Sequence, residues 1–355
     1  MFAHHSMAAE YDDKKPVTLK GTLTKFDWTN PHVYALIDVV GQGGSVTTWG
    51  VEFPSRIQLR AAGWMQDSVK VGDVVTVDGV SAKDGSKEAA AKLVTLANGR
   101  KLPLTAPVQA QSTAPSKPAP RWPDGHPRLG FVPGETGYWG APTAPNLYEN
   151  NASGPIMMNA DGVLTHIADA GRVAPFQPWA KGLYEYRQRT ILKDDPMASC
   201  LPPGGPRQFQ TPNGIEIVEQ PERKRIFIMS GGGNRNWRLI NLDGRAHQPD
   251  DVTPTYYGDS VGRWEGDTLV TDVIGFNEKF WFMNGGLPHT ENLHLTERIS
   301  RPDFNTLKYE VTVNDPGAYT RPWSTGLTMK WVPDREIDEY FCDEYNRDSE
   351  RIGSN

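Results

Sequence analysis

Strict alternation of apolar and polar residues runs through the second half of the sequence and restricts that half to β-structure. From residue 307 to residue 314 every odd position is apolar or aromatic and every even position is polar, and the same period returns at residues 327–331. Successive side chains of a strand point to opposite faces, so each run has one apolar face. Short runs of this kind recur from residue 215 to residue 342, which predicts an antiparallel meander of about eight to ten strands.

A meander with one apolar face is expected to close on itself, because closure removes the open edges and can enclose a cavity. We therefore predict that residues 124–355 form an antiparallel β-barrel of the calycin or lipocalin kind. An aperiodic, aromatic-rich segment at its start is expected to wrap the barrel surface, with Trp122 as one of its aromatic anchors. Residues 180–193 lack proline and are predicted to form a short helix.

The first part of the chain has a different pattern. Alternation at residues 17–24, further short strands and one helix near residues 55–62 predict five strands within residues 1–102, which suggests a small OB-like barrel. Residues 103–123 contain six prolines among Ala, Ser, Thr and Gln. Such a tract behaves as a semi-extended linker. The predicted fold class is mainly β, with two barrels joined by a Pro/Ala-rich linker.

Charge and hydropathy exclude two classes of partner. The chain has 355 residues, a net charge of -6 and no dense run of Lys or Arg, so nucleic acid is not expected. No run approaches the roughly 18 apolar residues of a membrane span. A small-molecule ligand or substrate is the predicted partner, and the sequence leaves the oligomeric state open.

The N-terminal residues suggest export. Met1, Phe2 and Ala3 precede His4 and His5, and the first three could be the scar of a removed leader with Ala3 at the cleavage position. We therefore expect a periplasmic or secreted protein.

The two cysteines, Cys200 and Cys342, could form a disulfide or stay as a buried free pair. Export favours the bridge. Two cysteines are too few for a zinc ribbon or an iron–sulfur cluster held by this chain alone.

The stretch 258–298 is the predicted site, because it joins an acidic turn, several aromatic residues and two of the eight histidines. If strand alternation reaches back to residue 289, then His289, Glu291 and Glu297 face the interior with the apolar residues. Asp272 is expected on the same inward face. A polar side chain inside a barrel is costly unless it is hydrogen-bonded or used in function.

A histidine beside a carboxylate at a cavity mouth suits general acid/base chemistry, because small environmental changes bring imidazole near the working pH. We predict His289, Glu291 and Asp272 as the catalytic residues of a cofactor-independent lyase, isomerase or hydrolase. The predicted substrate-binding residues are Trp264, Phe276, Trp281, His294 and Arg298.

Two alternatives for this stretch stay open. His289, Glu291 and His294 could ligate a metal, although strand geometry disfavours this because His294 faces the other way. The residues could also be purely structural, with Glu297 and Arg298 in ion pairs and His289 at the end of the loop.

The N-terminal histidines offer a separate hypothesis. His4, His5 and His32 are the candidate copper ligands. If processing exposes His4 as the chain terminus, its amine and ring could chelate Cu(II) with a third nitrogen from His32, because imidazole and amine nitrogens suit copper. The alternative is a polar chain terminus and one hydrogen-bonded loop histidine. No other cofactor is required.

Several long motifs resemble an exported bacterial protein family of unknown function. In the N-terminal part these are HHS at residues 4–6, AAEYD at 8–12 and WTNPH at 28–32. In the C-terminal part they are GDSVGRWEGDTLV at 258–270 and LHLTER at 293–298. The resemblance implies periplasmic export and a shared architecture, and it carries over no catalytic residue. Residues 246–249 depart from its pattern, so the resemblance assigns no role to His247.

The sequence thus predicts an exported protein that binds a small, largely apolar or aromatic molecule in its C-terminal barrel. One version adds acid/base chemistry at His289. The alternatives are a non-catalytic periplasmic binding or carrier module, and a copper-binding protein that uses His4, His5 and His32.

Overall fold

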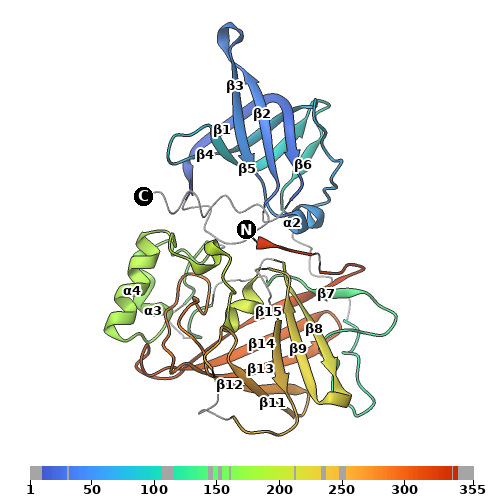
Figure 1. The fold of residues 1–355 in the computed structure, drawn as a ribbon, viewed down its shortest axis with the longest axis vertical. Helices are drawn as coiled ribbons and strands as arrows, with labels where there is room; N and C mark the ends of the chain where they lie inside the picture. Colours follow the sequence, from blue (N-terminus) through green and yellow to red (C-terminus); the bar gives the residue numbers. More distant parts are fainter. Residues whose placement is uncertain are drawn as a thin grey trace. The chain divides into compact units, whose positions relative to one another are not determined.

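The computed structural model describes residues 10–29, 32–105, 116–142, 147–150, 154–159, 161–211, 213–232, 237–247, 253–337 and 339–342. The chain divides into two compact units, one of Met1–Thr113 with Tyr340–Asn355 and one of Ala114–Glu339. Both are built mainly from β-strands (Figure 1), which confirms the predicted fold class.

The N-terminal unit is a six-stranded sheet that nearly closes into a ring. Its strands are β1 (Tyr11–Asp27), β2 (Tyr34–Val40), β3 (Val46–Glu52), β4 (Val74–Ala82), β5 (Glu88–Leu96) and β6 (Lys101–Pro103). They lie in the order β3-β2-β1-β4-β5-β6, and a parallel pairing between β3 and β5 brings the ends of the sheet together. This topology agrees with the predicted OB-like barrel.

One helix of this unit follows the predicted pattern. Helix α2 (Arg56–Ala61) begins after a capping box in which the Ser55 side chain accepts from the Gln58 N–H, and the Gln58 side chain accepts from the Ser55 N–H. Leu59 of the helix is fully buried. A short 3-10 turn, η1 (Gln42–Gly44), joins β2 to β3.

The C-terminal unit is a closed barrel of nine strands within the described residues. These are β7 (Gly137–Trp139), β8 (Ile215–Gln220), β9 (Arg225–Ser230), β10 (Trp237–Asn241), β11 (Asp259–Glu265), β12 (Thr268–Ile274), β13 (His294–Asp303), β14 (Thr306–Asn314) and β15 (Trp323–Pro333). The ring runs β10-β11-β12-β13-β14-β15-β7-β8-β9 and returns to β10. All neighbours are antiparallel except β10 and β11, which pair in parallel because a long connection, not a hairpin, joins them.

Strand β7 completes the ring by pairing on both sides. Trp139 lies opposite Trp331 of β15 and opposite Ile215 of β8. The Trp139 and Trp331 rings meet edge to face with centroids 5.1 Å apart. The closure therefore joins residues that are far apart along the chain.

Helices occupy the connections of the C-terminal unit, where α3 and α4 lie side by side in green in Figure 1. They are η2 (Ile167–Asp169), α3 (Ala170–Val173), α4 (Pro178–Arg189), η3 (Pro196–Ser199), η4 (Gly205–Gln210) and η5 (Pro221–Arg223). The predicted helix is α4, which buries Ala180, Tyr184 and Gln188 at a spacing of four residues. It ends at Arg189, before Ile191 and Leu192 adopt positive φ angles. No helix among the described residues is long and apolar enough to cross a membrane.

Both cysteines are oxidised. Cys200 and Cys342 are disulfide-bonded, and neither is a free thiol. The alternative of two free cysteines is therefore wrong.

A buried ion pair lies inside the barrel. The Arg238 guanidinium donates to both Glu297 carboxylate oxygens at 2.9 and 2.5 Å. Tyr309 Oη and Thr271 Oγ1 also donate to this carboxylate, each at 2.8 Å, and Arg238 Nε donates to Ser260 Oγ at 2.9 Å. Glu297 is 0% exposed and Arg238 2%. The inward position predicted for Glu297 is thus confirmed, and its charge is fully hydrogen-bonded.

Loss of this carboxylate is expected to destabilise the barrel strongly. Glu297→Gln leaves the Arg238 charge buried without its counter-ion, which should lower the free energy of unfolding by about 3 to 5 kcal/mol. Urea denaturation of both proteins measures the change. The control is Arg298→Gln, the next residue of β13, whose side chain is exposed and pairs with Glu265 at 3.0 Å. A loss for Glu297→Gln no larger than that of the control would contradict a stabilising role for the pair.

Candidate functional site

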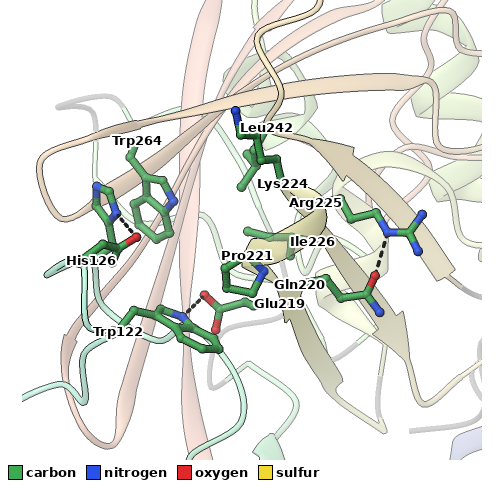
Figure 2. Close-up of a pocket in the computed structure, with 11 residues that line it drawn as sticks. Trp122, His126, Glu219, Gln220, Pro221, Lys224, Arg225, Ile226, Leu242 and Trp264 are labelled. Carbon is green, nitrogen blue, oxygen red and sulfur yellow. Dashed lines mark hydrogen bonds and ion pairs between the residues drawn. The ribbon is translucent and has the colours of Figure 1, made fainter.

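A pocket of about 280 Å³ opens within the C-terminal unit (Figure 2). Its apolar and aromatic walls come from Trp122, Pro221, Ile226, Leu242 and Trp264. Its polar lining comes from Asp124, His126, Glu219, Gln220, Lys224 and Arg225. The volume lies near the lower end of the range for small-molecule sites, about 300 Å³ and above.

Strand register places this pocket at one end of the barrel interior. Glu219 of β8 lies directly opposite Ile226 of β9, so both share the face of the buried Ile217 and Ile228. Trp264 lies opposite the buried Leu269 and thus also faces inward. These residues stand at the ends of their strands. The pocket therefore lies at one open end of the barrel, next to the packed core residues. We call this end the mouth of the barrel.

Residues 120–130, which we call the strap, cover this mouth. Within the strap, the Trp122 N–H donates to the His126 carbonyl at 2.8 Å. The Trp122 indole N–H donates to Glu219 Oε1 at 3.0 Å, and the Gly130 N–H donates to Glu219 Oε2 at 3.1 Å. The His126 ring stacks on the Trp264 indole with centroids 4.8 Å apart and an interplanar angle of 15°. The strap is thus fastened to two barrel strands and contributes one indole to the pocket.

The acidic groups of the pocket already have donors. Burial raises the pKa of Glu219, although the hydrogen bonds from Trp122 and the strap backbone oppose that shift. The backbone N–H of His126 lowers the pKa of Asp124, and the His126 ring lies 3.2 Å from the same carboxylate. Neither carboxylate is left without a partner.

The cationic side chains Lys224 and Arg225 differ from the carboxylates, because they have no charged partner in the described part of the chain. Arg225 donates through Nε to the Gln220 amide oxygen at 2.7 Å, and its guanidinium lies 5.0 Å from the Phe227 ring centroid. Lys224 is exposed at the turn between β8 and β9. Among the described residues, neither cation forms an ion pair with a carboxylate.

Of the residues predicted to bind substrate, only Trp264 lines this pocket. Phe276 follows the opposite end of β12 and is fully buried, with its ring 6.0 Å from that of Phe280. Trp281 is buried beside Arg187, whose guanidinium lies 4.6 Å from the indole centroid. His294 and Arg298 lie on the outer face of β13. The predicted set is therefore spread over both ends and the outside of the barrel.

His289 is buried among aromatic rings. Its ring meets Phe280 edge to face at 4.3 Å and stacks parallel to Phe282 at 6.0 Å. Its Nε2 has no hydrogen-bond partner among the described residues. Burial, together with the nearby positive charge of Arg187, lowers the pKa of His289 to about 3. The imidazole is therefore neutral at ordinary pH.

The two carboxylates predicted beside His289 lie elsewhere. Strand β13 begins at His294, so the alternation does not reach back to residue 289, and Glu291 is exposed in the preceding turn. The expected inward position of Asp272 is wrong, because it lies between the buried Thr271 and Val273 and therefore on the outer face of β12. Within the described residues, no carboxylate bonds to His289.

Asp272 belongs to a histidine–aspartate cluster on the outside of the barrel. His247 Nδ1 lies 2.7 Å from Asp259, and its Nε2 lies 3.0 Å from Asp272. His294 Nε2 lies 2.7 Å from the other oxygen of Asp272. His247 therefore fastens the connection after β10 to two strands.

The described residues contain no group of three or more side chains suited to hold a metal ion.

The proposed copper ligands His4 and His5 lie outside the described residues. His32 is buried, and its Nδ1 contacts a Glu52 carboxylate oxygen. Tyr11 Oη donates to the other Glu52 oxygen at 2.7 Å. A carboxylate on one ring nitrogen orients an imidazole in the way seen for metal-binding histidines.

Only part of the pocket could be predicted from the sequence. Trp122 is predicted as an anchor of a wrapping segment, but its partner Glu219 stands out only in the alternation of β8, where it falls on the face of Ile215 and Ile217. Lys224 and Arg225 look like ordinary surface residues of a turn. They lie near Trp264 only because the barrel closes, and the sequence does not predict the order of the strands around the ring.

The buried imidazole is expected to make stability sensitive to acid. In the unfolded chain His289 binds a proton below about pH 6.5, whereas in the folded chain it does so only near pH 3. The stability that this group contributes is present above about pH 6.5 and is lost as the pH falls toward 3. Between about pH 7 and 4.5, His289→Phe should lose about 2 kcal/mol less than the unsubstituted chain. Urea denaturation across that range tests this, with the exposed His166→Gln as control. Equal losses in His289→Phe and the unsubstituted chain would contradict the buried neutral state.

Comparison with known proteins reaches only the N-terminal part. The profile of DUF6152, a family of unknown function, matches residues 1–91. Neither the curated proteins nor the solved structures gave a significant match to the chain. The resemblance seen in the sequence is thus supported for the N-terminal region, as similarity to a family without an assigned activity.

Proposed function

We propose that the C-terminal barrel binds a small, largely apolar or aromatic molecule in the pocket at its mouth. The observation that carries this proposal is the pair of indoles, Trp122 and Trp264, that line one pocket from separate segments of the chain. Ile226 and Leu242 add aliphatic surface. A concave, mainly apolar site with a few polar groups is typical of small-molecule binding.

Large side chains pack against one another in the interior of the barrel. Phe209 of η4 stacks on Tyr309 with ring centroids 4.1 Å apart, and both are fully buried. The Arg238–Glu297 pair lies in contact with the same Tyr309. These contacts support a site at the end of the barrel, in place of the enclosed central cavity of a typical lipocalin.

Acid/base chemistry at His289 has less support than binding alone. The ring is buried, neutral and without a carboxylate partner in the described part of the chain. A general base needs hydrogen-bond reach to the proton that it removes. We therefore favour the non-catalytic binding or carrier form of the proposal.

An exported setting is part of the same proposal. Disulfides form and persist in oxidising compartments, and both cysteines of this chain are disulfide-bonded. A periplasmic or secreted binding module is consistent with that chemistry.

N-phenyl-1-naphthylamine, a neutral aromatic dye, tests the binding site. We expect saturable binding with increased dye fluorescence, and an affinity about tenfold lower for Trp264→Ala, because the substitution removes an aromatic wall. The matched control is Trp237→Ala, an exposed indole of β10 that does not line the pocket. Circular dichroism checks that both variants fold. Non-saturable binding, or an equal effect of the two substitutions, would refute the proposed site.

Copper binding by the N-terminal histidines is a second candidate, supported by the orientation of His32 by Glu52. Calorimetric titration of Cu(II) into protein that begins at His4 should give micromolar or tighter binding, and His32→Gln should weaken it about tenfold, because one of three nitrogen ligands is lost. His166→Gln serves as control. Binding weaker than micromolar, or the same affinity in all three proteins, would exclude this site.

A further inference from the structure

We infer that residues 121–127, the outer part of the strap, act as a flap that opens when a ligand enters or leaves the barrel-mouth pocket. This role rests on the proposed binding function and adds control of ligand exchange at the same site. Three residues that line the pocket belong to the flap, namely Trp122, Asp124 and His126. Opening of the flap therefore removes one wall of the pocket.

The flap keeps its shape through contacts within itself. Arg121 forms a β-bridge with Pro127, and the Trp122 N–H donates to the His126 carbonyl at 2.8 Å. The Gly125 N–H donates to the Trp122 carbonyl at 2.9 Å and closes a turn in which Gly125 has a φ of 94°. These bonds do not involve the barrel. The flap can therefore swing away as one body, without unfolding.

The base of the strap, by contrast, is fixed to the barrel. Arg301 of β13 is buried and donates through Nη1 to the Arg128 and Gly130 carbonyls, each at 3.0 Å. The Trp139 indole N–H donates to the Leu129 carbonyl at 2.7 Å. A Cβ at Gly130 would overlap a backbone carbonyl oxygen of β8, so the strap backbone lies directly on that strand. Opening of the flap leaves these buried contacts intact.

An exposed ion pair, which we call the latch, joins the flap to the barrel. Arg121 donates to both carboxylate oxygens of Asp267, at 2.8 and 2.6 Å. Asp267 lies in the turn between β11 and β12. The two side chains are 49% and 62% exposed, so the pair is weak and is screened by salt. The latch thus favours the closed flap without making its opening costly.

Two further contacts join the flap to the pocket walls (Figure 2). The His126 ring stacks on Trp264, and the Trp122 indole N–H donates to Glu219. The His126 ring thereby covers a face of the Trp264 indole, which is a surface that an aromatic ligand can also use. With so few contacts to break, we expect the open flap as a minor state, in about 0.1–10% of the molecules.

Stopped-flow kinetics with N-phenyl-1-naphthylamine test the flap. Arg121→Gln removes the latch from the free and the bound protein alike, so the open fraction rises in both. We expect the association and dissociation rate constants to increase together, about three- to fivefold, while Kd stays within about twofold. The matched control is Arg298→Gln, which breaks the exposed pair with Glu265 of the same hairpin and does not touch the flap.

The other half of the latch gives a second, independent variant. Asp267→Asn should raise both rate constants as Arg121→Gln does, and the double variant should be no faster than either, because all three lack the same ion pair. Raising the NaCl concentration should speed ligand exchange in the unsubstituted protein more than in Arg121→Gln, which has no latch to screen.

The outcomes separate the flap from the binding function. Unchanged rate constants in Arg121→Gln, a dissociation rate constant that rises alone, or an equal effect of Arg298→Gln would overturn the flap, while saturable, Trp264-dependent dye binding still supports the pocket. Loss of saturable dye binding in the unsubstituted protein would overturn the pocket and the role of the flap with it.

Discussion

The buried carboxylate of Glu297 is the constraint on which the C-terminal barrel depends. An ionised group with no exposure to water needs a counter-ion and hydrogen bonds, and Glu297 receives them from Arg238 of β10, Thr271 of β12 and Tyr309 of β14. Arg238 also reaches Ser260 of β11. Five neighbouring strands of the ring are thus joined by one buried ion pair and its hydrogen bonds. A shift of any of them by one residue would turn its contributing side chain outward, so the network specifies the register of this half of the barrel.

The same network helps to determine which part of the barrel interior is packed and where the pocket lies. Together with Phe209 it fills the middle layer, and the aromatic residues Phe276, Phe280 and Phe282 are buried beyond the far end of β12. At the mouth of the barrel the last inward-facing residues are Trp264, Leu242 and Ile226. The strap, residues 120–130, covers this end. The apolar pocket is a consequence of strands that end before the interior is fully packed.

The sequence predicted the parts that depend on local periodicity. Alternation in β14 and β15 and the inward position of Glu297 follow from a period of two, and the helix at α4 follows from an uninterrupted, proline-free run. The errors arose where periodicity was extended beyond the strand that carries it. His289 and Glu291 precede β13, so the alternation does not apply to them.

Asp272 shows a second limit. Val270 and Thr271 precede it and Val273 and Ile274 follow it, so the phase of β12 is obscured, since β-branched residues suit either face of a strand. The pocket shows a third limit, because Trp122, Glu219 and Trp264 are distant in sequence and share no local pattern. Their association depends on tertiary closure of the ring, and the partners of the strap cannot be read from the composition of the strap itself.

The position of β7 in the ring has a consequence for synthesis of the chain. Trp139 pairs with Ile215 and with Trp331, so the strand made first is the one that waits longest for its second neighbour. Hairpin pairs such as β8–β9 and β13–β14 can form soon after they leave the ribosome, but the ring stays open until β15 has emerged. A nascent chain stopped before that point would hold a curved, open sheet with its inner aromatic face exposed. Shortening the chain at the C-terminal side of the barrel would leave this sheet open, so we expect aggregation and not a smaller folded domain.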